Sequence, residues 1–337
     1  MTLGMKRKAV FFLLCFLVSF LDIEASQLSF KICGGGSWVY GGDLNKNIQG
    51  WNNYFNDRNK NPYSFDYDVK ELHSLWEGGA EVGYALSSRF RVALGLEFLA
   101  GATEGEMFSS LNQEQDYYNS ADDFGTIFLD EQSFQKPEYR VQSIPLTLTL
   151  YYSLPLGPRA SIFIGCGGGY YSGKITYKEN YEYNFDYKDE KNLSGSLLEF
   201  VDQYSSSGTY SEKSTSKAYG FHAKAGLELN IRRGLYLIIE AQGRLVDFNI
   251  WSGNKKDSYT WNHTWGYWGA FSDNGSSEES KEGKLWMVEY NSEQTGKSYP
   301  RLVFSGEEPL SSSFSGARAA KINLNGFSFR VGIKISL

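Results

Sequence analysis

The side chains most able to do acid–base chemistry in this sequence are its three histidines, His73, His222 and His263. A hydrolytic site built on histidine needs a nucleophile beside the ring and a carboxylate that orients it. Glu77 follows His73 by four residues and shares its face of an alternating segment, but Ser74 points to the opposite face. His263 stands apart in a long polar stretch. The spacing does not assemble a catalytic set, so we expect no catalytic residues and no enzymatic activity.

A second stretch with chemical potential is acidic. Residues 103–138 carry carboxylates such as Glu104, Asp116 and Asp130, with Lys136 as the base among them. Carboxylate oxygens suit Ca²⁺, but these residues do not follow the spacing of a calcium-binding loop. We therefore expect a hydrated acidic surface without a metal site, and we likewise predict no cofactor.

The elements that position these residues are β-strands. From Gly326 to Leu337 apolar and polar residues alternate without a break, and this period of two is typical of a strand with one apolar face. A change in the parity of the apolar residues at Ser172–Gly173 predicts a β-bulge. The same alternation recurs along the chain and predicts eight strands, over residues 27–40, 72–86, 90–98, 139–154, 160–177, 217–231, 235–250 and 326–337.

The connections between these strands alternate between short and long. Short turns follow the second, fourth and sixth strands, whereas the long connections are residues 41–70, 103–138, 178–217 and 251–320. Outer-membrane barrels have an even number of strands, short turns at one end and long loops at the other. In lipid, backbone groups at sheet edges are satisfied only when the sheet closes. We therefore predict an all-β fold, an eight-stranded antiparallel up-and-down transmembrane β-barrel with long extracellular loops.

The N-terminal segment has the features of an export signal. Lys6, Arg7 and Lys8 precede a short apolar run, and small residues follow at Ala25 and Ser26. The run is too short to span a bilayer comfortably as a helix. We predict a signal peptide over residues 1–25 and a barrel domain over residues 26–337, secreted across the inner membrane to the bacterial outer membrane. The net charge of −6 argues against nucleic acid as a partner.

Over residues 26–337 the chain resembles the small eight-stranded outer-membrane barrels of the OmpA, OmpX and OmpW type. The most specific element of the resemblance is a C-terminal assembly signal, in which a polar residue precedes a glycine and two hydrophobic residues. These positions are Arg330, Gly332, Ile335 and Leu337. The family usually ends in an aromatic residue, whereas both hydrophobic positions here are aliphatic. The resemblance implies outer-membrane lipids and the barrel-assembly machinery as partners.

The inward-facing positions of the predicted strands hold acids and bases in nearly equal number. An eight-stranded interior is just wide enough for side chains to fill it, and unpaired charges in a dry interior are costly. We therefore expect a salt-bridged network that plugs the lumen, with a polar ion path as the alternative. The predicted network comprises Lys31, Glu77, Glu81, Arg91, Glu97, Lys224, Glu228, Glu240, Arg244, Arg330 and Lys334.

Aromatic residues crowd the first limb of the fourth long connection. Exposed aromatic clusters often mark interaction surfaces, and their rings can stack on sugars. An extracellular glycan or another surface ligand is therefore a candidate partner; the alternative is that the rings pack together as a lid. Residues 284–290 and 299–305 predict a further hairpin. The candidate contact residues are Trp251, Tyr259, Trp261, Trp265, Tyr267 and Trp268.

These expectations combine into a non-enzymatic outer-membrane barrel with a largely plugged lumen and a structural or surface-interaction role. Two alternatives stay open. One is an OmpW-like channel or transporter for small molecules, hydrophobic ones included. The other is a lipid-modifying outer-membrane enzyme.

Overall fold

The computed structural model describes residues 27–58, 63–120, 123–193 and 196–337. The predicted signal peptide lies outside these residues. Antiparallel strands make up most of the described chain, and one α-helix, α2 (Asp43–Arg58), interrupts them. Within the described ranges, no helix is both long enough and apolar enough to cross a membrane.

Eight strands form a closed ring. Strand β1 pairs with β3 on one side and with β14 on the other, and β8 pairs with β7 and β14, so every member has two neighbours. All pairings are antiparallel, and the eight predicted strands lie at the expected positions. The ring consists of β1 (Leu28–Val39), β3 (Ser74–Ala85), β4 (Phe90–Ser120), β5 (Asp123–Pro155), β6 (Ala160–Leu193), β7 (Ser196–Arg232), β8 (Leu235–Phe248) and β14 (Gly326–Ser336).

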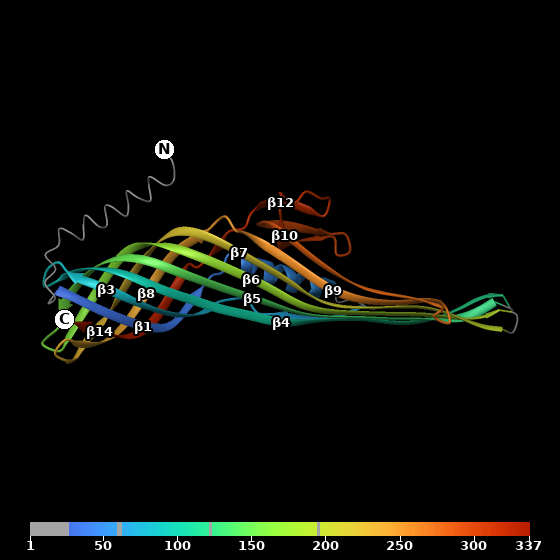
Figure 1. Ribbon diagram of the computed structural model, residues 1–337, viewed down its shortest axis with the longest axis horizontal. Helices are drawn as coiled ribbons and strands as arrows, with labels where there is room; N and C mark the ends of the chain where they lie inside the picture. Colours follow the sequence, from blue (N-terminus) through green and yellow to red (C-terminus); the bar gives the residue numbers. More distant parts are fainter. Residues whose placement is uncertain (1–26, 59–62, 121–122, 194–195) are drawn as a thin grey trace.

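The predicted long loops are largely strands, which corrects the expectation of extended extracellular loops. Strands β4 to β7 continue past the rim of the ring as paired hairpins, and their register runs on through residues 103–138 and 178–217. Strand β5 has 33 residues, which corresponds to roughly 110 Å at the usual rise per residue. Figure 1 shows these strands leaving the ring as one tapering sheet.

This extended sheet exchanges partners where it leaves the ring. Strand β2 (Tyr63–Val69) takes the place of β3 beside β4, and β9 (Ser252–Tyr267) takes the place of β8 beside β7. Strand β10 (Phe271–Ser292) follows β9 and pairs with β11 (Lys297–Ser305) and with β12 (Phe314–Ala319). The two-residue strand β13 (Ile322–Asn323) pairs with the end of β8.

The structure confirms the hairpin predicted in the fourth connection, and it contains a helix in the first connection that was not predicted. Strands β10 and β11 pair Lys284 with Ser305 and Tyr290 with Tyr299, which is the expected hairpin. Helix α2 lies in the first long connection, which was expected to be a polar loop. Gly50 allows α2 to pack tightly against β11, because a Cβ atom there would lie 2.1 Å from the carbonyl oxygen of Pro300.

The predicted bulge in the fifth strand is wrong. The register of β6 with β5 and with β7 is continuous along the whole strand. Ile162 and Ile164 point outward and are exposed, whereas Tyr171 and Ile175 point inward and are buried. The parity of the apolar residues changes because the ring interior changes from charged to apolar along its axis, and the backbone itself stays regular.

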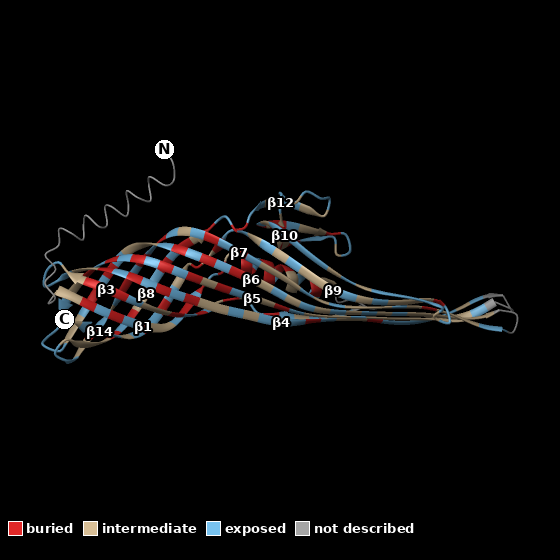
Figure 2. Cartoon of the chain, viewed as in Figure 1, coloured by how far each residue is buried: buried red, intermediate tan, exposed pale blue. Residues whose placement is uncertain are grey.

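Burial alternates residue by residue around the ring, and Figure 2 shows the resulting checkerboard. Outward positions are apolar and exposed to an unusual degree for a folded chain. The exposed outward residues include Phe30, Ile32, Val82, Leu94, Leu96, Ile144, Leu146, Leu148, Leu150, Leu154, Ile162, Ile164, Val331, Ile333 and Ile335. We call this set the apolar band.

Candidate functional site

The predicted charge network fills the middle of the ring, and its centre is Arg330. One guanidinium nitrogen of Arg330 lies 3.0 Å from Glu77 and 2.9 Å from Glu97, and the other contacts Glu240. Arg244 lies 3.2 Å from the second oxygen of Glu77. Arg330 is 1 % exposed. These contacts join residues of four strands, β3, β4, β8 and β14, so the network ties opposite walls of the ring together.

Two lysines complete this central group. The ammonium of Lys31 lies 2.8 Å from Glu81 and 2.9 Å from Glu240. Lys224 pairs with Glu81 and lies 3.1 Å from Glu97. All of these side chains are almost completely buried. The central group therefore holds four bases and four acids, a balance that a dry interior requires.

A smaller group lies nearer the short turns. Glu228 accepts contacts from Arg91, at 3.2 Å, and from Lys334. Between this group and the centre, the hydroxyl of Tyr151 donates a hydrogen bond of 2.8 Å to Glu81. All eleven residues of the predicted network thus have an ion-pair partner within the described chain, and every carboxylate among them is shared by at least two bases.

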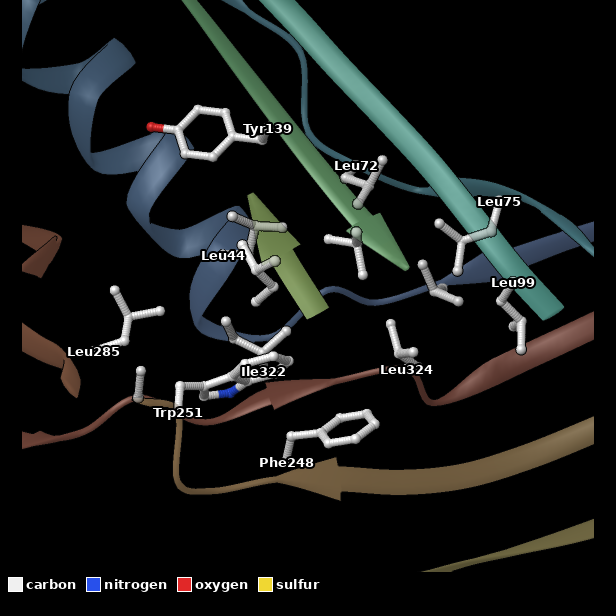
Figure 3. Packing of buried hydrophobic residues seen from close by; sticks show 14 of the residues in the cluster. Leu44, Leu72, Leu75, Leu99, Tyr139, Phe248, Trp251, Leu285, Ile322 and Leu324 are labelled. Atoms are coloured by element: carbon white, nitrogen blue, oxygen red, sulfur yellow. The ribbon is translucent and has the colours of Figure 1, made fainter. Parts of the chain in front are cut away.

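Above the charges, toward the extended sheet, the interior becomes apolar. Leu44 and Ile48 of α2 insert into the mouth of the ring and are at most 1 % exposed. Figure 3 shows their neighbours from several strands converging on the helix. We call this set the apolar plug. It includes Val39, Leu44, Ile48, Leu72, Leu75, Leu99, Tyr139, Val141, Tyr171, Ile175, Val246, Phe248, Trp251, Ile322 and Leu324.

Polar side chains of α2 fix the helix to the ring wall. The amide of Asn45 donates to the carbonyl of Leu72 at 3.0 Å and accepts from its backbone N–H at 2.8 Å. At the start of the helix, Asp43 accepts a bidentate pair of hydrogen bonds from Arg318, at 2.6 and 2.8 Å, and a third from the N–H of Lys321. Buried polar groups that are paired in this way hold one geometry. The helix is therefore a fixed part of the plug.

The residues of the proposed assembly signal divide between the two sides of β14. Arg330 points inward and belongs to the charge network, and Gly332 stands opposite Cys33 of β1. Ile335 and Leu337 point outward and are 48 % and 58 % exposed. The hydrophobic positions are thus available on the outer surface.

The candidate contact residues do not share one environment. Trp251 is 1 % exposed and packs against Phe248 inside the apolar plug, so its prediction as a surface contact is wrong. It was misassigned because the connection that begins after β8 was expected to be an exposed loop, whereas Trp251 at its start folds back into the ring. Tyr267 and Trp268 lie at the β9–β10 turn and are 55 % and 66 % exposed.

The other candidates lie on a broad face of the extended sheet. Residues directly opposite each other in a sheet point to the same side, and the register aligns Ser133, Tyr183, Ser206 and Trp261 across β5, β6, β7 and β9. The opposite face is mainly polar, with residues such as Asn184. We call the first surface the aromatic face. It carries Tyr181, Tyr183, Phe185, Tyr187, Phe200, Tyr204, Tyr259, Trp261, Trp265 and Tyr267, which are partly or fully exposed.

At its inner end the aromatic face deepens into a pocket of about 480 Å³. Helix α2 forms one wall, the β10–β11 hairpin a second, and strands β2, β4 and β5 the floor. Its rings include Trp51, Phe55, Phe65 and Phe314, and Arg301 of β11 is among its lining residues. Sequence reasoning missed this site, because α2 was not predicted and its aromatic residues were read as loop.

The three histidines occupy separate surroundings. His222 lies inside the ring, where its Nε2 is 2.8 Å from the hydroxyl of Thr149. His263 lies on the aromatic face, 2.7 Å from Asp202 and stacked on Trp265. His73 lies near the rim, 3.1 Å from Glu71. Glu77, which follows His73 by four residues, pairs with Arg244 and Arg330 in the charge network.

Comparisons with known proteins find only distant structural similarity. No protein-family model matches the chain, and no curated protein matches it. The outer-membrane protein OprG from Pseudomonas aeruginosa aligns over 91% of this chain and 94% of its own at 11% identity, with a TM-score of 0.30. The outer-membrane protease OmpT from Escherichia coli aligns over 94% and 99% at 10% identity, with a TM-score of 0.26.

Proposed function

We propose that this chain is an outer-membrane β-barrel protein whose ring spans the bilayer and does not conduct. The observation that carries the proposal is the outer face of β5. From Ile144 to Leu154 its outward residues are apolar, an eleven-residue length, and the next outward residues are Gln142 and Arg140. A tilted membrane strand needs about 9–11 residues. A surface of this kind in water would be strongly unfavourable, so the apolar band fits lipid.

The closed interior supports a non-conducting role. An ion entering along the axis would meet first the apolar plug and then a network in which every charge is already paired. Neither layer offers a hydrated path. Passage of small molecules would require both the apolar plug and the charge network to move. We therefore rank a channel or transporter function second to a non-conducting role.

The aromatic face supports a surface-interaction role, and we propose a glycan as its partner. Its flat rings match the C–H faces of sugars, and Asp202, Ser206 and Asp273 lie on the same face as hydrogen-bonding groups for hydroxyls. The polar opposite face of the same strands is consistent with a sheet that stands in water outside the membrane. We further propose that the protein acts by binding and is not an enzyme.

The barrel assignment is tested by gel mobility in detergent with and without boiling. The unheated protein is expected to migrate as a compact, protease-resistant species that shifts on heating. Leu148→Lys places a charge within the apolar band and should prevent this species from forming, because such a charge at mid-bilayer costs about 2–4 kcal/mol. The matched control Asn184→Lys, on the polar face of the extended sheet, should leave it intact. A stable monomer in water without detergent would refute the assignment.

A further inference from the structure

The pocket at the inner end of the aromatic face contains a buried charge without a counter-charge. Arg301 is 6 % exposed, yet no carboxylate of the described residues lies within ion-pair distance of it. Its Nε atom also has no hydrogen-bond partner there. Buried charges are ordinarily paired, because their desolvation is otherwise uncompensated. Arg301 therefore differs from the bases inside the ring, each of which contacts at least one glutamate.

Aromatic rings surround the guanidinium group of Arg301. Its central carbon lies 3.1 Å from the ring centroid of Trp51, 4.9 Å from that of Tyr54 and 5.2 Å from that of Tyr290. Contact with ring faces compensates a cation only in part. Burial accordingly lowers the pKa of Arg301 to about 10. The planar edge of the group, which can donate two parallel hydrogen bonds, is the part that an anion would use.

The rest of the pocket lining is mainly apolar, and its polar members include Arg58, Gln135 and three serines. Phe55, Phe65, Met107, Leu111 and Phe314 line it, and its volume is within the range of sites for small organic ligands. Glu131, on the floor, is the carboxylate among the lining residues. A ligand that fits this arrangement carries its negative charge at one end only and an apolar body at the other.

We propose that this pocket binds a small organic anion, a carboxylate on an apolar, ring-containing body. The carboxylate pairs with Arg301, and the body packs among the aromatic rings between α2 and the β10–β11 hairpin. Because α2 also carries the apolar plug, the pocket and the closed mouth of the ring share one helix. The proposal concerns a small-molecule site and does not depend on whether the aromatic face binds a glycan.

Calorimetry on the detergent-solubilised full chain tests the proposal, with a titration into micelles alone subtracted. The probes are 2-naphthoate, its neutral analogue 2-naphthalenemethanol, and inorganic phosphate. We expect 2-naphthoate to bind more tightly than either of the others. Arg301→Leu should lower the affinity for 2-naphthoate at least tenfold and leave the affinity for 2-naphthalenemethanol unchanged. The control Arg89→Leu, at an exposed short turn, should change neither.

Two further variants guard against loss of folding. Arg301→Lys keeps the charge and should retain part of the 2-naphthoate affinity, whereas Leu111→Trp fills the pocket and should abolish binding of both aromatic probes. Each variant is first checked for the heat-dependent gel shift. Absence of 2-naphthoate binding to the wild type, equal binding to the wild type and Arg301→Leu, or phosphate binding as tight as 2-naphthoate would each overturn the proposal. None of these results would affect the barrel assignment.

Discussion

Replacing Arg330 with methionine removes the base that contacts the largest number of glutamates in the ring. Glu77 then keeps Arg244, Glu97 keeps Lys224, and Glu240 keeps Lys31. The central group falls from four bases and four acids to three bases and four acids. One buried negative charge is therefore left uncompensated, although each glutamate still touches a base.

Removal of one partner from a buried ion pair costs about 3–5 kcal/mol, and we expect Arg330→Met to lie in this range. Glu97→Gln should cost a similar amount, because it leaves four bases for three acids. In the double variant the central group is again balanced, at three and three. Its destabilisation should therefore be at least about 2 kcal/mol smaller than the sum of the two single effects, since neighbouring sites of one network are not additive.

The measurement is urea unfolding of the refolded protein in lipid vesicles, followed by tryptophan fluorescence and extrapolated linearly to zero urea. Arg89→Met, at an exposed turn, controls for loss of an arginine outside the ring and should change the unfolding free energy by less than about 0.5 kcal/mol. The reasoning is refuted if Arg330→Met matches this control. Simple additivity of the two network substitutions would also refute it.

Three further outcomes are expected. In planar bilayers the wild type and Arg330→Met should both lack steady conductance, because the apolar plug still closes the ring; regular openings of the wild type would favour the transport reading instead. Trp261→Ala combined with Trp265→Ala should weaken glycan attachment at least tenfold while the heat shift persists, since buried anchors contribute about 2 kcal/mol each; unchanged attachment would exclude this face. Burial alone would raise the pKa of Asp43, but hydrogen bonds from Arg318 and from a backbone N–H lower it. The ionised carboxylate therefore stabilises the folded protein at pH values above the usual carboxyl pKa. This stabilisation is lost as the pH falls through the lowered pKa. Asp43→Asn should cost about 1.5–3 kcal/mol and expose α2 to protease at neutral pH, where equal cleavage of both proteins would count against this role.

Strict alternation made the ring predictable. In β14 each residue has one of two sharply different environments, so Phe329 and Arg330 could be assigned to opposite faces from their chemistry alone. Pairing of the inward charges followed from the narrow interior. The particular partners did not follow, because they depend on strand stagger, which brings Arg330 of β14 to Glu97 of β4 across the ring.

The extended sheet was missed for a different reason. From Tyr181 to Tyr187 aromatic and polar residues alternate as regularly as in the ring, but both kinds are compatible with an exposed loop, and residues 178–217 were assigned to a long connection. Helix α2 was missed because its buried face includes Asn45 and Asn47. These residues are poor helix formers. They fit here through hydrogen bonds to other segments, Asn45 to Leu72 and Asn47 to Tyr139 and Leu302, which no local pattern reveals.

The change of parity in β6 marks a change in the chemistry of the ring interior, not a bulge in the strand. Residues 165 and 167 face the charge network and residues 171 and 175 face the apolar plug, all on one side of a regular strand. The ring interior is thus filled by two layers of different chemistry, which fail under different perturbations. Charge removal weakens the network but leaves the plug, whereas loss of the contacts of Leu44 and Ile48 weakens the plug but leaves every ion pair. A conducting variant should therefore require substitutions in both layers, and single substitutions in either layer should alter stability without opening a path.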